Sequence, residues 1–107
     1  MYARHTTVFP HPDKMQAVAD LLRDDAIPFY QKQPGYRGFV VLVRDQDLVG
    51  INLWESEAAW IAVRGSDAQA QQKDHFVAIT QGFFRQGPVV LFYDVPVAVL
   101  ADRDMTG

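Results

Sequence analysis

Residues 50–60, Gly-Ile-Asn-Leu-Trp-Glu-Ser-Glu-Ala-Ala-Trp, have the pattern of a strand that runs directly into a helix. Ser56 is a favourable residue at a helix N-terminus, and Trp60 follows within that helix. Asn52 and Trp54 are two residues apart, so their side chains point to the same face of the strand. The stretch therefore predicts that one amide and two indoles lie close together where a sheet meets a helix. This arrangement fits a pocket for a flat aromatic ligand, or simply a hydrophobic core.

Composition restricts the class of protein. A chain of 107 residues is enough for one domain. The net charge of −3 and the scattered basic residues argue against a nucleic-acid or membrane surface. The absence of cysteine excludes disulfides, thiolate metal sites and a cysteine nucleophile. No apolar segment reaches the ~20 residues of a membrane span, so we expect a cytoplasmic protein without nucleic-acid or membrane partners.

The hydrophobic periodicity predicts six elements, namely strand 2–9, helix 14–32, strands 36–44 and 48–55, helix 56–84, and strand 89–99. In the first helix, Asp13 and Gln16 have the spacing of a capping box, and Pro28 should kink or interrupt the last turns. Pro34-Gly35 should end that helix.

The second helix should break near Gly65–Asp67, where Ser66 or Asp67 can cap a second piece. That piece should carry one stripe of side chains and should end at Gly87-Pro88. The stripe consists of Gln72, Phe76, Ile79 and Phe83.

The order βαββαβ predicts an α+β, ferredoxin-like domain with an antiparallel four-stranded sheet, spanning residues 1–100, and a flexible tail at 101–107. Strands 36–44 and 89–99 contain continuous apolar runs, which indicate burial on both faces. A second copy of the chain is the simplest cover, so we expect a homodimer with facing sheets. Pro96 would suit an edge strand that crosses to the partner. An aggregation-prone monomer is the alternative.

Three segments carry a resemblance to a known family: Tyr2-Ala-Arg4, Gln33-Pro-Gly-Tyr-Arg-Gly38 and Leu53-Trp-Glu-Ser-Glu-Ala-Ala59. The chain resembles, over roughly residues 2–97, the antibiotic biosynthesis monooxygenase-like proteins of the dimeric α+β barrel superfamily. The resemblance implies either a cofactor-independent monooxygenase that oxidises anthrone-type polyphenols to quinones, or a haem-degrading oxygenase.

In the quinone-forming members, an asparagine and a tryptophan on the third strand line the pocket, with an aromatic residue on the next helix. Trp54 and Trp60 match the two aromatic positions. The family's asparagine position is Gly50 here, and Asn52 lies two residues closer to the tryptophan on the same face. The likeness to haem-degrading members is weaker, because Val63 stands near their tryptophan and His75 lies two residues from their iron ligand.

These patterns give candidate site residues. We expect Asn52 to donate to a phenolate or ketone oxygen, His75 to act as a base, and Trp54 to complete the catalytic group. The expected ligand-binding residues are Trp60, Phe76, Phe83, Tyr30 and Tyr36. Each has a structural alternative: the aromatic residues as core, Asn52 bonded to a neighbouring backbone, and His75 as a solvated helix residue.

The leading functional hypothesis is a cofactor-independent monooxygenase that oxidises a polycyclic aromatic substrate of the anthrone or phenol type to a quinone. No metal site is expected, because no histidine has a ligand-like spacing to nearby carboxylates. The partners expected are a small aromatic or hydrophobic ligand and a second copy of the chain. The alternatives are a non-catalytic dimer that binds a small hydrophobic ligand, an isomerase or cyclase, and a haem-degrading relative.

Overall fold

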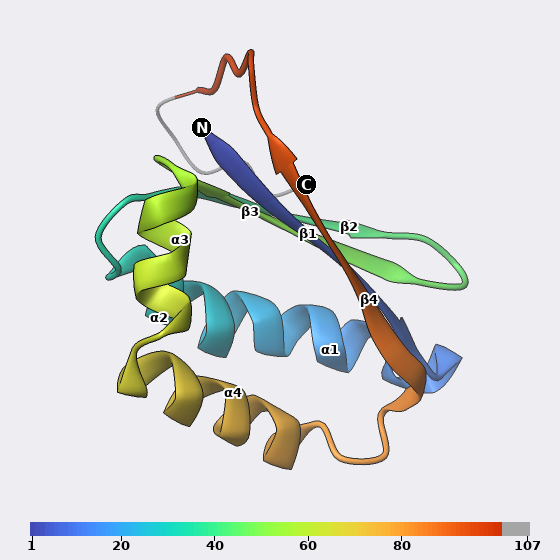
Figure 1. Ribbon diagram of the computed structural model, residues 1–107. Helices are drawn as coiled ribbons and strands as arrows, with labels where there is room; N and C mark the ends of the chain where they lie inside the picture. Colours follow the sequence, from blue (N-terminus) through green and yellow to red (C-terminus); the bar gives the residue numbers. More distant parts are fainter. Residues whose placement is uncertain (102–107) are drawn as a thin grey trace.

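A four-stranded antiparallel sheet carries all the helices on one of its faces in the computed structural model, which describes residues 1–101 (Figure 1). The strands lie in the order β2-β3-β1-β4, which confirms the predicted ferredoxin-like α+β fold. Their bounds are β1 Tyr2–Pro10, β2 Tyr36–Val43, β3 Leu48–Trp54 and β4 Phe84–Asp94. The helical elements are η1 Pro12–Lys14, α1 Met15–Leu21, η2 Leu22–Ala26, α2 Ile27–Gln31, α3 Glu57–Arg64 and α4 Asp67–Ile79.

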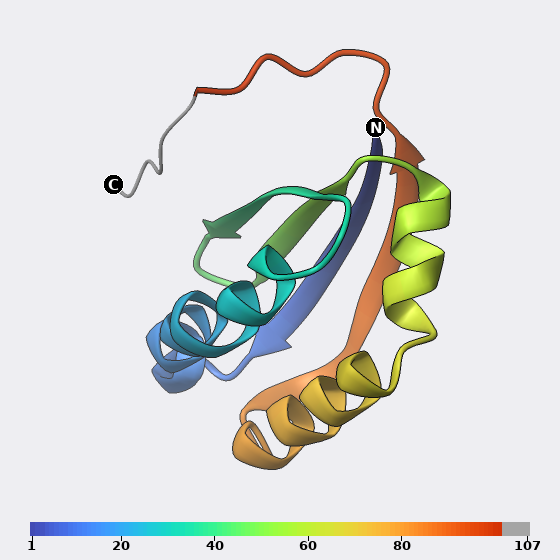
Figure 2. The ribbon, with the colours of Figure 1, turned by 90° about the vertical axis from the view of Figure 1, so that its left-hand side faces the viewer.

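The helices form two groups beneath the sheet. Figure 2 shows α1 and α2 at the lower left, α3 at the right beside β4, and α4 at the bottom. Strand β3 buries alternate residues toward the helices: Leu48, Gly50, Asn52 and Trp54. Its turn to β2 is closed by Arg44, which donates two hydrogen bonds to the Asp47 carboxylate and thereby lowers the pKa of that group.

The hydrophobic core lies between β3, α2 and α3. Trp54 is fully buried, and its ring centroid lies 5.6 Å from that of Trp60 and 6.0 Å from that of Tyr30. Ala26 and Val63 complete this cluster of buried side chains. Large aromatic rings dominate small cores. Trp54 and Trp60 therefore have the structural role offered as their alternative, whether or not they also take part in a site.

The first helical segment begins without the predicted capping box, and it is interrupted ahead of Pro28. No side chain caps its start, and Gln16 donates to the carboxylate of Asp20 at 2.9 Å, so the capping box predicted with Asp13 was wrong. The segment is interrupted by the π-helical turn η2, directly before Pro28. Proline lacks the N–H of a regular helical bond, which accounts for a disruption at this position.

The second half of the chain corrects two boundaries. Ser66 caps α4 as predicted, by accepting a hydrogen bond from the Gln69 amide, but α4 ends at Ile79. Phe83 therefore lies outside the helix and off the predicted stripe. Gly87-Pro88 does not end a helix but lies inside β4, where the pairing with β1 gains one residue between Gln86 and Val89. An edge strand tolerates proline at such a bulge.

The last strand ends earlier than predicted. Strand β4 stops at Asp94, so the prediction that Pro96 lies in a crossing edge strand was wrong. Residues 95–101 continue without regular structure, above the sheet (Figures 1 and 2). Of the tail predicted for 101–107, residues 102–107 lie outside the described residues.

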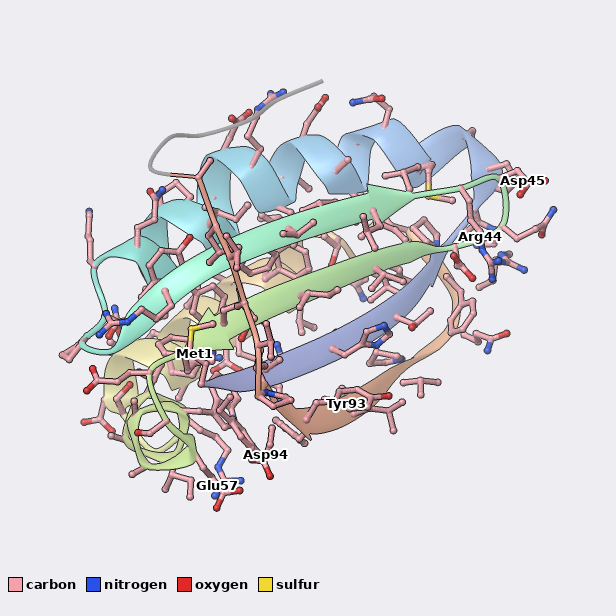
Figure 3. The ribbon with its side chains drawn as sticks, turned by 90° about the horizontal axis from the view of Figure 1, so that it is seen from above. Met1, Arg44, Asp45, Glu57, Tyr93 and Asp94 are labelled. Carbon is pink, nitrogen blue, oxygen red and sulfur yellow. The ribbon has the colours of Figure 1, made fainter. Side chains whose placement is uncertain are left out.

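The face of the sheet away from the helices is apolar and exposed. Figure 3 looks onto this outer face, with Tyr93 projecting from β4 and the chain after β4 passing in front of the strands. By the alternation and register of the strands, the outer face carries one set of large side chains that are at least 44% exposed. They are Val40, Leu42, Val89, Leu91 and Tyr93.

Replacing Gly35 by alanine should destabilise the loop that packs against α3. Gly35 has φ of 83°, and a Cβ there would lie 2.6 Å from the Cβ of Ala59. Left-handed strain and overpacking together should lower the free energy of unfolding by about 2–4 kcal/mol. Gly82 is a matched control, because its φ is 82° but a Cβ would meet nothing within 4 Å. Equal losses in urea unfolding of Gly35→Ala and Gly82→Ala would contradict the close approach to α3.

Candidate functional site

A cavity of about 1000 Å³ lies between the inner face of the sheet and the helices. Its floor comes from all four strands and its walls from α1, η2, α2, α3 and α4. Most of the lining is apolar, with a few polar groups, which is the usual composition of a small-molecule site.

Asn52 is held in one orientation on the cavity floor. Its Oδ1 accepts a 2.6 Å hydrogen bond from Nε1 of Trp54, which is itself fully buried. An indole N–H can only donate, so the acceptor must be the carbonyl oxygen of the amide. The other end of the amide is then an NH₂ group, and the described residues supply it with no acceptor. The partner of Asn52 is thus a side chain, not the neighbouring backbone that sequence reasoning offered as the alternative.

Trp60 brings an indole from α3 to the same region. The side chain lines the cavity and is only 4% exposed, yet its Nε1 has no hydrogen-bond partner within residues 1–101. The guanidinium carbon of Arg4 lies 5.2 Å from the centre of its ring, close enough for a cation–π contact. Phe92 on β4 pairs with Arg4 on β1, and its ring centroid lies 6.3 Å from that of Trp60.

A series of polar side-chain contacts links α4 to α2 and η2 at the cavity wall. Gln69 lines the cavity and donates to the Tyr30 hydroxyl at 3.2 Å. Gln72, one turn later on α4, donates to the carboxylate of Asp25 in η2. The same carboxylate lies 3.4 Å from Nε2 of His75. These bonds tie α4 to η2 and α2 across one wall of the cavity.

The structure brings some predicted site residues together and separates others. Four of them line the cavity: Asn52, Trp60, Tyr30 and Phe76. Trp54 is hydrogen-bonded to Asn52. His75 does not line it: its side chain is 54% exposed and faces Asp25.

Two aromatic residues expected at the ligand also lie elsewhere. The Tyr36 ring packs against Trp54, with 6.2 Å between ring centroids, and does not line the cavity. Phe83 contacts Lys14, whose ammonium lies 5.0 Å from the ring centre. The helix stripe that suggested Phe83 does not extend beyond Ile79.

Sequence reasoning missed several polar lining residues. Arg4 and Thr6 line the cavity from β1, and Thr6 Oγ1 is buried without a partner among residues 1–101. The signal was present in the alternation of strand 2–9 and in the fold, because β1 is central in a ferredoxin-like sheet and pairs Arg4 with Asn52. Gln69 could not be found in this way, since its contact with Tyr30 depends on how α4 packs.

Metal-ligating side chains do not gather in the described part of the chain: residues 1–101 contain no group of three or more His, Asp or Glu side chains that could hold a metal ion. None of the helices described is long and apolar enough to cross a membrane. No histidine lines the cavity within the same residues, so haem held by an axial histidine does not fit the side chains present.

Comparison with known proteins places this geometry in context. The sequence model of a family described as antibiotic biosynthesis monooxygenase matches residues 1–79. A comparison with curated proteins finds no match.

Solved structures share the fold at low sequence identity. A monooxygenase from the gene ActVA-Orf6 of Streptomyces coelicolor, in complex with nanaomycin D, has a TM-score of 0.75 and 17% identity, over 94% of this chain and 92% of that one. A protein of unknown function from Nitrosomonas europaea, NE2512, has a TM-score of 0.72 and 18% identity, over 95% of each chain. A variant of SnoaB, a cofactor-independent oxygenase from Streptomyces nogalater, has a TM-score of 0.65 and 16% identity, over 92% and 95%.

Proposed function

Because the chain belongs to the antibiotic biosynthesis monooxygenase family, we propose that it is a cofactor-independent monooxygenase that oxidises a polycyclic phenol or anthrone to a quinone. The observation that carries the proposal is the amide of Asn52 on the floor of a large, mainly apolar cavity: Trp54 fixes it, and residues 1–101 offer no acceptor to its NH₂ group. Two structures with this fold are of a monooxygenase bound to a small molecule and of a cofactor-independent oxygenase.

The proposed reaction requires few chemical groups from the protein. An electron-rich anion of the substrate gives electrons to O₂, which adds to the ring carbon; one oxygen atom becomes the new carbonyl and the other leaves as water with the two hydrogens lost from the substrate. The protein has to keep the substrate dry and oriented, and to stabilise the charge on its oxygen. In this proposal Asn52 donates to that oxygen, while Trp60, Tyr30 and Phe76 hold the rings.

Oxygen uptake tests this proposal. Metal-free protein should consume O₂ with anthrone above the uncatalysed rate, and loss of an oriented donor should slow this about 10²–10³-fold in Asn52→Ala. Asn52→Asp is the sharper variant, because a carboxylate still accepts from Trp54 but offers no donor, and it should be equally impaired. Gln71→Ala, which removes an exposed amide of α4 outside the cavity lining, should be unaffected. Wild-type uptake in Asn52→Asp would contradict the role of the amide.

A second copy of this chain is the occupant proposed for the outer face of the sheet. Five large side chains of β2 and β4 are exposed on that face: Val40, Leu42, Val89, Leu91 and Tyr93. Nδ1 of His5, on the same face, is buried without a partner within residues 1–101. Monomeric proteins seldom expose an apolar patch of this extent. A two-fold axis would place the same patch of each copy against the other. The cavity lies on the opposite face, so each copy keeps its own site.

A non-catalytic ligand-binding protein is the second candidate, and the position of His75 favours it. The residue expected to act as a base lies outside the cavity, and no His, Asp or Glu among residues 1–101 lines it. A ligand that quenches tryptophan fluorescence but is never oxidised would support this candidate over the monooxygenase.

A further inference from the structure

Among residues 1–101, the charged side chains that line the cavity are all positive. Arg4, Arg64 and Lys73 contribute to the lining, whereas no Asp, Glu or His of the described chain does. This is the reverse of the whole sequence, in which 13 acidic residues outnumber 10 basic ones. A cationic lining in an acidic chain favours anions over neutral or cationic ligands, and it raises the local concentration of anions at the mouth.

Arg4 is the innermost of these cations and lies beside the proposed oxygen site. In the sheet it pairs directly with Asn52 on β3 and with Phe92 on β4, so the three side chains share the inner face. No carboxylate of residues 1–101 lies within the 4.0 Å of an ion pair with its guanidinium, although Arg23, Arg37 and Arg44 all have such a partner. Its positive charge is therefore not neutralised by an ion pair within residues 1–101.

The other two cations lie toward the solvent. Arg64 ends α3, and Lys73 is exposed on α4. Burial and then a hydrogen bond with Glu57 raise the pKa of Tyr2, and the carboxylates of Glu57 and Asp94 act on the same phenol near Arg64. Both outer cations are placed to attract an anion, and Arg4 is placed to hold it.

From this arrangement, and resting on the proposed function, we infer that the substrate is bound as an oxyanion, with its charged oxygen between the Arg4 guanidinium and the Asn52 amide. Ionisation breaks the acidic O–H or C–H bond, leaves the electron pair on the substrate and releases the proton to water. Stabilisation of the anion by Arg4 takes the place of a base, which residues 1–101 do not supply to the cavity lining. The charge of arginine persists at any working pH, so the site does not lose it by deprotonation.

The acidity of a bound probe tests this inference without any turnover. The probe is 2-hydroxyanthraquinone, a flat phenol whose colour changes on ionisation. In a pH titration with excess wild-type protein, its pKa should fall by at least about one unit, which corresponds to about tenfold tighter binding of the anion than of the neutral phenol. In Arg4→Gln the pKa of the bound probe should return to within about half a unit of the free value.

Two further variants control for charge and for folding. Arg4→Lys keeps a positive charge and should retain part of the shift. Arg37→Gln removes a guanidinium that pairs with Glu55 on the surface, outside the cavity, and should keep all of it. A bound probe whose pKa is unshifted in wild type, or equally shifted in Arg4→Gln, would overturn the inference while leaving the oxygen-uptake test untouched. A probe that does not bind at all, together with no oxygen uptake, would overturn this inference and the proposed function alike.

Discussion

Substituting alanine for Trp54 should lower the free energy of unfolding by about 3–5 kcal/mol, among the largest effects of any single substitution in this chain. The side chain is fully buried and contacts the rings of Tyr30, Tyr36 and Trp60. Its loss leaves a cavity that these rings cannot fill. Urea unfolding followed by circular dichroism measures the change.

Trp54→Phe separates the hydrogen bond from the packing. Phenylalanine keeps most of the apolar surface but leaves Oδ1 of buried Asn52 without its donor, which should cost about 1–3 kcal/mol. A double-mutant cycle with Asn52→Leu should show a coupling of about 1 kcal/mol between the two positions. Additive effects of the two substitutions would contradict the bond that orients the amide.

Replacing Leu91 by lysine should convert the proposed dimer into a monomer. Leu91 lies on the outer face of β4, and the two-fold symmetry of a dimer would bury two unpaired ammonium groups. The dimer dissociation constant should rise at least ~100-fold, since each 1.4 kcal/mol is a factor of ten. Sedimentation equilibrium of the wild type and the variant over a range of concentrations measures this.

Ile61→Lys is the matched control for this substitution. Ile61 on α3 is 46% exposed and Leu91 is 47% exposed, so both accept a lysine equally well in a monomer. Only Leu91 lies on the face proposed to be covered. A wild-type chain that stays monomeric at high concentration, or equal effects of the two substitutions, would rule out this interface.

The strands of this fold could be predicted because their signals are local. The alternation around Asn52 and the turn after Val43 place the β2–β3 hairpin correctly, and the element order then gives the sheet topology. The ends of the last two elements could not be predicted in this way. Gly87-Pro88 is a strong breaker in isolation, but a bulge on an edge strand accommodates it, and only the pairing with β1 reveals that.

The candidate site could be predicted in part for the same reason. Asn52, Trp54 and Trp60 are close in sequence and were placed together correctly, with the indole as the unexpected partner of the amide. The direction of the His75 side chain could not be predicted. Neighbouring positions on a helix point in different directions, so Phe76 faces the cavity whereas His75 faces Asp25. Arg4 is far from Asn52 in the sequence, and its importance depends on the packed molecule, in which no acidic side chain of residues 1–101 lines the cavity.

The origin of the oxygen in the product tests whether this cavity carries out oxygenation without a cofactor. Protein freed of metal with a chelator is supplied with anthrone under isotopically labelled O₂, in ordinary water, and the quinone is analysed by mass spectrometry before its carbonyls exchange. Quinone should form above the uncatalysed rate, with one labelled oxygen atom in each molecule, and much more slowly with Asn52→Asp. Quinone formed no faster than without protein, or carrying oxygen only from water, would contradict cofactor-free oxygenation in this cavity.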